Sequence, residues 1–339
     1  AEWKGQYVAA NGLRPQESWL ARPERFAQIG QRFVSLTNRM LGSPQARWFL
    51  ERLTGIASGR KLPKVAKTTF LRMAQKMRLT HSERGSQRKV AYFVDVYANW
   101  FDTELAQATV AVLRHNGFSV FVPPRQLPAG MPLVASGAID AARAQARKNV
   151  AYLAEIIRQG YTIVTSEPSA ALCLTHEYRY LLPDEDEAQL VAEHTCDVGS
   201  LLWKEHLQGR LQLDFKPRAM KLVYHLPCHL KALPDHAPGL NLLKLIPGLN
   251  VQMAQRGCSG MAGMFGIKRQ NYRTSLRIGW DLIDAVRDPT VHGATTECST
   301  CKLQMEQGGD KPTVHPMKIL ASAYGILRSD TDPLDRHSQ

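Results

Sequence analysis

Cysteine is scarce in this sequence, and long apolar runs are absent. Six cysteines in 339 residues are too few for the disulfide framework of a small secreted protein. No stretch approaches the roughly 18 to 20 apolar residues of a membrane-spanning helix, and the opening Ala1-Glu2-Trp3-Lys4 lacks the apolar core of a signal peptide. We therefore expect a cytoplasmic protein of about two compact units. The missing initiator methionine fits either processing or a piece of a longer protein.

Several catalytic signatures are also missing. The sequence has no Gly-x-Ser-x-Gly elbow, no Walker loop and no dinucleotide-binding fingerprint. Ester or peptide hydrolysis, nucleotide hydrolysis and nicotinamide binding therefore have no support. The sequence identifies no catalytic residue.

Acidic residues are sparse in the first quarter of the chain. Residues 1–89 hold 18 Lys and Arg against 5 Asp and Glu, whereas residues 90–339 hold 25 of each. The quarter is divided into predicted helical pieces by four prolines, namely Pro15, Pro23, Pro44 and Pro63. We assign 1–88 to a basic helical segment that contacts an acidic partner domain or anionic lipid on the inner face of the membrane. A solvated linker is the alternative, and without a nucleic-acid-binding motif we expect no nucleic acid partner.

Four of the six cysteines lie in one C-terminal block. They occur in three motifs, namely Tyr-His-Leu-Pro-Cys228-His, Gly-Cys258-Ser-Gly-Met-Ala-Gly and the pair Cys298-Ser-Thr-Cys301. Four thiolates can enclose an iron–sulfur cluster or a structural zinc ion, and both remain open at this level. Cys173 and Cys196 are expected to pack as small apolar side chains.

From residue 89 onward the sequence contains an internal repeat with an offset of about 130 residues. The matching pairs are Lys89-Val-Ala-Tyr92 with Lys221-Leu-Val-Tyr224, Gly130-Met131 with Gly260-Met261, and Thr165-Ser-Glu-Pro-Ser169 with Thr295-Thr-Glu-Cys-Ser299. The predicted strands at 90–96 and 162–165 correspond to those at 222–226 and 294–296. The predicted fold is α/β, with tandem homologous units at 89–218 and 219–328 related by a pseudo-two-fold, and a tail at 329–339.

The first repeat lacks the cysteines of the second. The residues that take their places are Val96 for Cys228, Pro128 for Cys258, Pro168 for Cys298 and Ala171 for Cys301. Cys228 and Cys298 each follow a predicted strand, and ligands of open α/β sheets bind beyond the carboxyl ends of strands. We therefore predict a metal site in the second unit and a scaffold role for the first.

These motifs resemble the cysteine-rich CCG domain. That domain occurs twice in the B subunit of heterodisulfide reductase, in the C subunit of anaerobic glycerol-3-phosphate dehydrogenase, and in the C-terminal part of FAD-linked 2-hydroxyacid dehydrogenases. The resemblance is carried by His225-Leu-Pro-Cys-His-Leu-Lys-Ala232, Cys258-Ser-Gly-Met-Ala-Gly-Met-Phe-Gly266, Thr296-Glu-Cys-Ser-Thr-Cys-Lys302 and the remnants Gly130-Met-Pro-Leu and Ser166-Glu-Pro-Ser-Ala-Ala-Leu-Cys173. It covers nearly the whole chain and implies a piece that follows a ferredoxin-type domain in a long flavoprotein.

One departure limits what the resemblance implies. The full CCG motif has two adjacent cysteines, and here the second is Ser259, so a five-cysteine noncubane cluster is not carried over. The four remaining cysteines fit a [4Fe–4S] cluster or zinc. Ser259 is expected to donate a hydrogen bond to a cluster sulfur or to cap the next turn. His229 is expected to ligate or assist a thiolate, or to satisfy a local carbonyl.

The resemblance implies an oxidoreductase that is complete only with its partners. FAD in a partner domain or chain would oxidise a 2-hydroxy acid such as lactate, glycolate or 2-hydroxyglutarate. Electrons would then pass through iron–sulfur centres in this chain to a quinone or another acceptor. The alternatives are a zinc-bearing docking module and thiol–disulfide chemistry like that of heterodisulfide reductase.

Other charged and sulfur-containing residues have simpler interpretations. Lys268 and Arg269, after the glycine-rich turn, are expected to balance cluster charge, to bind an acidic substrate or to begin a solvated helix. Met131 and Met261 are expected to pack under their turns. The acidic run 184–187 is expected at a helix N-terminus.

Overall fold

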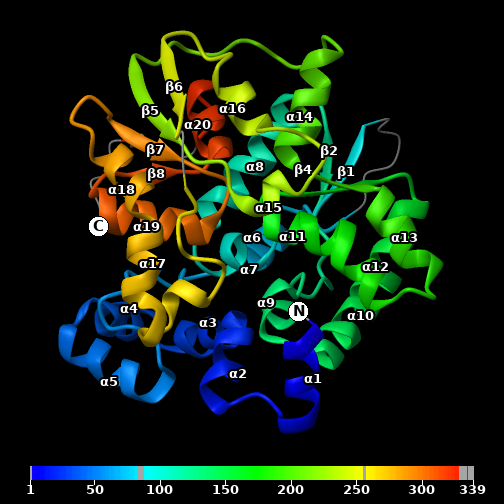
Figure 1. Cartoon of the computed structure of the whole chain (residues 1–339). Coiled ribbons are helices and arrows are strands. Elements are labelled where there is room, and N and C mark those ends of the chain that lie inside the picture. Colours follow the sequence, from blue (N-terminus) through cyan, green and yellow to red (C-terminus); the bar gives the residue numbers. More distant parts are fainter. Residues whose placement is uncertain (1, 82–87, 255–256, 328–333, 335–339) are drawn as a thin grey trace.

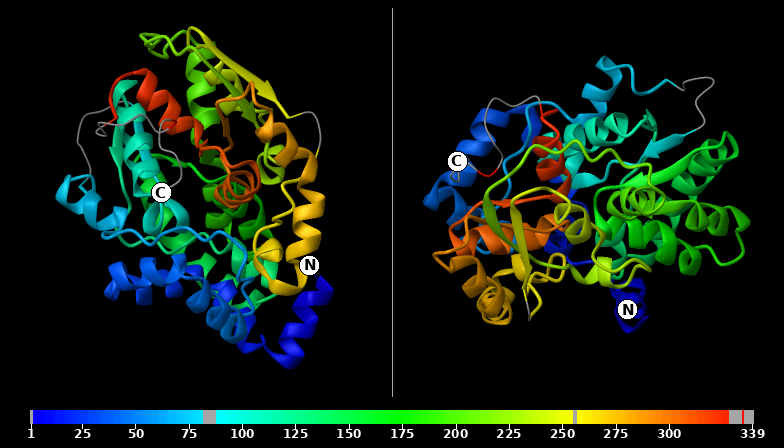
Figure 2. Two further views of the ribbon diagram at one scale, coloured as in Figure 1. Left: turned by 90° about the vertical axis from the view of Figure 1, so that its left-hand side faces the viewer. Right: turned by 90° about the horizontal axis from the view of Figure 1, so that it is seen from above.

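The basic N-terminal segment is a layer of short helices. The computed structural model describes residues 2–81, 88–254, 257–327 and 334, so most of the predicted tail at 329–339 lies outside the described residues. The helices of the segment are α1 (Glu2–Asn11), α2 (Pro15–Ala21), α3 (Pro23–Arg32), α4 (Val34–Gly42), α5 (Pro44–Thr54) and α6 (Phe70–Lys76). Helices α1–α5 lie together at one end of the molecule (Figure 1; Figure 2, left).

Three of the four prolines in this segment begin helices. Pro15, Pro23 and Pro44 are the first residues of α2, α3 and α5, where a proline loses no intrahelical hydrogen bond and its fixed φ suits the helix. Pro63 lies in the irregular connection between α5 and α6. The predicted helical pieces are therefore present, and prolines define three of their starts.

The next part of the chain forms a four-stranded parallel sheet with the strand order β2-β1-β3-β4. Its strands are β1 (Lys89–Tyr92), β2 (Ser119–Phe121), β3 (Thr162–Thr165) and β4 (Thr195–Asp197). Its helices are α7 (Val96–Trp100), α8 (Thr103–His115), α9 (Met131–Ser136), α10 (Ile139–Arg158), α11 (Pro168–Leu172), the π-helical turn η1 (Cys173–Glu177), α12 (Tyr178–Leu181), α13 (Asp186–Glu193) and α14 (Val198–Leu207).

The last part forms a second four-stranded parallel sheet, with the order β6-β5-β7-β8. Its strands are β5 (Met220–Tyr224), β6 (Leu249–Met253), β7 (Gly293–Thr295) and β8 (Thr313–Val314). Its helices are α15 (Cys228–Lys231), α16 (Pro238–Leu243), the 3-10 turns η2 (Phe265–Ile267) and η3 (Arg269–Asn271), α17 (Tyr272–Ile278), α18 (Trp280–Arg287), α19 (Ser299–Gly309) and α20 (Pro316–Ala323).

The two sheets share strand order and direction, so the prediction of an α/β fold is confirmed. In each sheet the first strand is flanked by the second and third, and Thr165 and Thr295 both end the third strand. The helix caps at the fourth strands also correspond, because Asp197 at the end of β4 caps α14 and His315 directly after β8 caps α20, each through a side chain that accepts a backbone N–H. These parallels support a duplication, whereas the pseudo-two-fold relation stays a prediction.

One predicted strand was too long. The expected strand at 90–96 ends at Tyr92, and Val96 already begins α7. The run Val90-Ala-Tyr-Phe-Val94 is buried throughout, so its apolar pattern did not show where the ladder stops. Pairing with the neighbouring strands decides that boundary.

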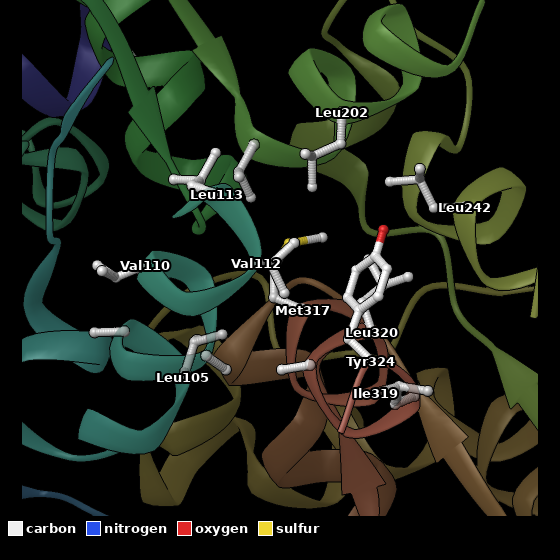
Figure 3. Close-up of a cluster of buried hydrophobic side chains, with 14 of the residues drawn as sticks. Leu105, Val110, Val112, Leu113, Leu202, Leu242, Met317, Ile319, Leu320 and Tyr324 are labelled. Carbon is white, nitrogen blue, oxygen red and sulfur yellow. The ribbon is translucent and has the colours of Figure 1, made fainter. Parts of the chain in front are cut away.

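A shared hydrophobic core joins the two sheet units. Helix α8 of the first unit packs against α20 of the second, and Leu113, Val112, Met317 and Leu320 belong to one buried cluster (Figure 3). Burial of each such side chain contributes about 1.5 to 3 kcal/mol. The units are therefore not independent in stability.

Candidate metal centre

The four C-terminal cysteines line a single pocket of about 180 Å³. Cys228 begins α15 shortly after β5, Cys258 lies in the loop after β6, and Cys298 and Cys301 flank the start of α19 after β7. These three strands are neighbours in one parallel sheet, so their carboxyl ends open at the same edge. The fold thereby brings together four thiols that are separated by up to 73 positions in the sequence.

The other two cysteines lie elsewhere. Cys173 is fully buried, and its thiol donates to the Ala129 carbonyl at 3.2 Å. Cys196 lies in β4 of the first sheet and packs against the shared core. Neither residue lines the cysteine pocket. Both occupy the packing positions expected for them.

The corresponding positions of the first unit hold apolar side chains. Pro168 begins α11, and Ala171 packs with Leu230 and Leu233 beside α15 of the second unit. Val96 begins α7. In the first unit, the positions that correspond to the cysteine pair therefore lie at the contact between the two units.

The loop that carries Cys258 depends on glycine. Gly260 has φ of +78°, and a Cβ there would lie 2.1 Å from the Ser275 carbonyl oxygen. No other residue fits this close approach to the turn at α17. The same glycine donates its N–H to the Cys258 sulfur at 3.3 Å. The glycine-rich sequence therefore both permits the turn and aims a donor at a sulfur.

Hydrogen bonds to sulfur make the CxxC pair unequal. A hydrogen bond from Cys301, helped by the Thr300 hydroxyl and two backbone N–H groups, lowers the pKa of Cys298. The hydrogen bond with Cys298 and burial raise the pKa of Cys301 well above its usual value. The start of the eleven-residue α19 also favours a thiolate. Cys298 is consequently the first of this pair to ionise.

Ser259 both donates a hydrogen bond to a sulfur and caps the following turn, the two roles expected from its position in the sequence. The side chain is buried, its hydroxyl donates to the Cys301 sulfur at 3.1 Å, and the same oxygen accepts the Met261 N–H at 3.4 Å. Donation to a sulfur and stabilisation of the turn are therefore combined in one residue.

Two histidines and a lysine complete the pocket wall. His229 lines it, and burial lowers the pKa of this imidazole, so it is neutral near pH 7. His225 and Lys231 also line the pocket, and burial, followed by the Lys231 charge, lowers the pKa of His225 to about 4. Sequence reasoning did not single out His225 or Lys231, although both lie within the motif around Cys228.

Lys268 and Arg269 face the helical layer. Lys268 Nζ lies 2.9 Å from Glu17 of α2, and Arg269 Nε lies 3.1 Å from Glu51 of α5. Ile56 forms a β-bridge with Lys268. The two cations therefore fasten the cysteine loop to the N-terminal segment, a role that none of the sequence interpretations included.

The methionines and the acidic run lie where expected. Met261 is fully buried with Leu20 and Ile267, and Met131 packs against the core of the first unit. Asp186 and Glu187 occupy the first turn of α13. These residues have structural roles.

Arg60 connects the layer to both cysteine-bearing elements. This arginine is 1% exposed. Its guanidinium donates to the Gly266 carbonyl at 3.0 Å, to the Ser275 hydroxyl at 3.1 Å and to Gln304 of α19. It also lies 4.7 Å from the centre of the Tyr272 ring. Sequence reasoning missed Arg60 because its partners lie more than 200 positions away.

The first unit reaches the cysteine site through two acidic side chains. Glu167 accepts a hydrogen bond from the Ser299 hydroxyl in the first turn of α19. Asp102 lies 3.5 Å from Lys302, the residue after Cys301, and 3.2 Å from Lys318. The cysteine-bearing helix is thus held by both units.

Four cysteines are a donor set that iron–sulfur clusters and structural zinc both use. Among the described residues, no group of three or more His, Cys, Asp or Glu side chains is arranged to hold one metal ion. The pocket of about 180 Å³ is lined by ten further residues besides the four cysteines. The chemistry of the donors therefore fits either group.

Comparison with known proteins identifies the class of this site. Residues 222–306 match the model of the cysteine-rich domain family named CCG. The match contains all four cysteines that line the pocket.

Most of the chain is similar to subunits of a dehydrogenase and of a reductase. It is 28% identical to the C subunit of anaerobic glycerol-3-phosphate dehydrogenase from Escherichia coli, over 90% of this chain and 76% of that protein. It is 25% identical to the B subunit of fumarate reductase (CoM/CoB) from Methanothermobacter marburgensis, over 68% of this chain and 44% of that protein. Identity to lactate utilization protein A of Bacillus cytotoxicus is 29%, over 53% of this chain and 75% of that protein.

No helix among the described residues has the length and apolar character needed to cross a membrane.

Proposed function

We propose that this chain is the electron-transfer module of an oxidoreductase complex, with an iron–sulfur cluster held by Cys228, Cys258, Cys298 and Cys301. The observation that carries the proposal is the position of these four cysteines around one pocket. The similarity to dehydrogenase and reductase subunits supports it. When bound, such a cluster supplies a one-electron carrier.

The residues around the sulfurs would tune that carrier. Ser259 O–H and Gly260 N–H both point at cysteine sulfurs, and donors of this kind stabilise added negative charge and raise the potential. Neutral His225 and His229 add no charge to the wall. Among the described residues that line the pocket, Lys231 is the one cation, and its charge opposes the negative charge of four thiolates.

We favour a cluster over zinc because the similar proteins include components of a dehydrogenase and a reductase, and electron transfer needs a redox-active centre. A zinc-bearing docking module is the alternative that metal analysis would reveal. Thiol–disulfide chemistry is weakened by Ser259, which stands where a second adjacent cysteine would be.

The finer assignment concerns donor, substrate and acceptor. We propose that a flavin in a partner domain or subunit delivers the electrons, and that a quinone or another carrier accepts them. The similarity to lactate utilization protein A supports a 2-hydroxy acid as the substrate of the flavoprotein. The similarity to a component of glycerol-3-phosphate dehydrogenase points to another hydroxylated substrate, so turnover with both classes is the deciding assay.

Metal analysis under anaerobic conditions tests the cluster. We expect iron, sulfide and broad visible absorbance in the wild-type protein, strong loss of all three in Cys298→Ala, and no loss in the control Cys196→Ala. Colourless protein that contains stoichiometric zinc would contradict electron transfer and favour the docking role.

A further inference from the structure

The helical layer α1–α5 exposes an unusual amount of apolar surface. It makes up about a sixth of the chain, yet it holds more than half of the exposed large apolar side chains among the described residues. Trp3 is 87% exposed, Phe33 69% and Leu53 60%. Large exposed apolar patches are rare on monomeric soluble proteins and mark interaction sites. Helices α2 to α5 contact one another in sequence and across α2 and α5, and α1 lies at the same end of the molecule (Figure 1).

The outward charges of this layer are all basic among the side chains that the structure describes. The exposed charged residues are Lys4, Arg14, Arg25, Arg32, Arg39 and Arg52. The acidic side chains Glu17, Glu24 and Glu51 are only partly exposed, and Glu17 and Glu51 pair with Lys268 and Arg269 behind the layer. The outer face therefore complements a negatively charged surface.

The inner face of the same layer rests on the cysteine loop. Leu20 of α2 packs with Met261 and Ile267 in a buried cluster. The Ala57 N–H donates to the Ile267 carbonyl at 2.9 Å. A molecule seated on the outer face would thus lie one helical layer away from the loop that carries Cys258.

We propose that the outer face of α1–α5 is the docking surface for the protein that delivers electrons to the cysteine site. The docking face of that partner protein would present carboxylates around an apolar patch. Five of the six exposed basic residues are arginines, and they are interspersed with Trp and Phe. Protein interfaces are enriched in Arg and aromatic residues and depleted in Lys, so this composition favours a protein partner over lipid. The inference rests on the proposed electron-transfer function.

Hydroxyl-radical footprinting read by mass spectrometry tests the docking surface. The chain is compared alone and in the flavin-containing assembly isolated through a tag on it, with the donor recognised by its flavin absorbance. We expect oxidation of Trp3, Phe33 and Trp48 to fall about fivefold or more in the assembly, because interface cores exclude water. Tyr180 and Trp280, which are 72% and 52% exposed, serve as internal controls and should not change.

Charge reversal gives a second measurement. We expect Arg25→Glu/Arg32→Glu/Arg39→Glu to lower the flavin that co-purifies with the chain. The matched variant Lys148→Glu/Arg179→Glu/Lys204→Glu reverses three exposed cations elsewhere and should leave flavin recovery unchanged.

Three results would overturn the inference: no protection of the layer in the assembly, no flavin isolated with the wild-type chain, or protection by phosphatidylcholine–phosphatidylglycerol vesicles alone. The last result would identify lipid as the occupant. Iron and sulfide analysis of the same isolated chain tests the cluster separately. If the layer is not protected but iron and sulfide are present, only the proposed docking surface is refuted, and the proposed electron-transfer function stands.

Discussion

Arg60 is predicted to hold the two cysteine-bearing elements in place. Its guanidinium is buried and donates to Gly266 in the loop after Cys258, to Ser275 of α17 and to Gln304 in the helix that begins at the CxxC pair. Replacement by methionine keeps much of the side-chain length but removes these donors. We expect Arg60→Met to loosen both elements.

The magnitude follows from the groups left without a partner. Each buried acceptor that loses its donor costs about 1 to 3 kcal/mol, and three acceptors are affected. Relief from burying the guanidinium offsets part of this cost. We expect a net loss of about 3 kcal/mol, which corresponds to a fall in Tm of about 4 °C for a chain of this length. Arg60→Lys retains the charge but not the several N–H donors of the planar guanidinium, so its Tm should lie between those of Arg60→Met and the wild-type protein.

The assay combines thermal unfolding with alkylation of Cys301 in the metal-free protein. Cys301 is 5% exposed, so wild-type protein should protect it, and Arg60→Met should speed its alkylation about tenfold or more as local opening becomes easier. The control is Arg88→Met, because Arg88 pairs with Glu205 and the Asn116 carbonyl in the first unit. That variant should lower Tm without exposing Cys301. An Arg60→Met protein with unchanged Tm and unchanged Cys301 protection would refute the reasoning.

Three further predictions concern acid stability, redox potential and electron flow. Burial lowers the pKa of His315 to about 4, whereas an unfolded histidine titrates at about pH 6.5. As pH falls through this window the unfolded chain binds the proton first, and about 3 kcal/mol of stability is lost. Urea unfolding at pH 7 and pH 4.5 should therefore show a smaller loss of unfolding free energy for His315→Asn than for the wild-type protein. Ser259→Ala removes the donor to Cys301 and should lower the cluster midpoint potential in an anaerobic redox titration; an unchanged potential would show that the bond does not tune the site. Cys298→Ala should leave stopped-flow reduction of the partner flavin by substrate intact while steady-state turnover falls, whereas unchanged turnover with the metal lost would remove the centre from the electron path.

Local sequence determined the elements and the convergence of the cysteines. Pro15, Pro23 and Pro44 begin helices because proline suits the first helical turn. Cys228 and Cys298 follow parallel strands, and such strands open at one edge. The repeat at an offset of about 130 residues predicted that the second sheet would follow the order of the first. These features depend on short-range geometry, which residue spacing encodes.

The tertiary structure alone decided how the parts support the site. The hydrogen bonds of Arg60, the pairing of Lys268 with Glu17 and the hydrogen bond from the Ser299 hydroxyl to Glu167 join residues more than 100 positions apart. No local pattern specifies such pairs, because they depend on how the helical layer and the two sheet units pack. The same packing faces the acidic side chains of α2 and α5 inward, buries Arg47, and leaves Arg52 and the aromatic side chains of these two helices outside. The sequence showed the excess of basic residues in this segment, whereas only the assembled fold decided which of them lie on the outer surface.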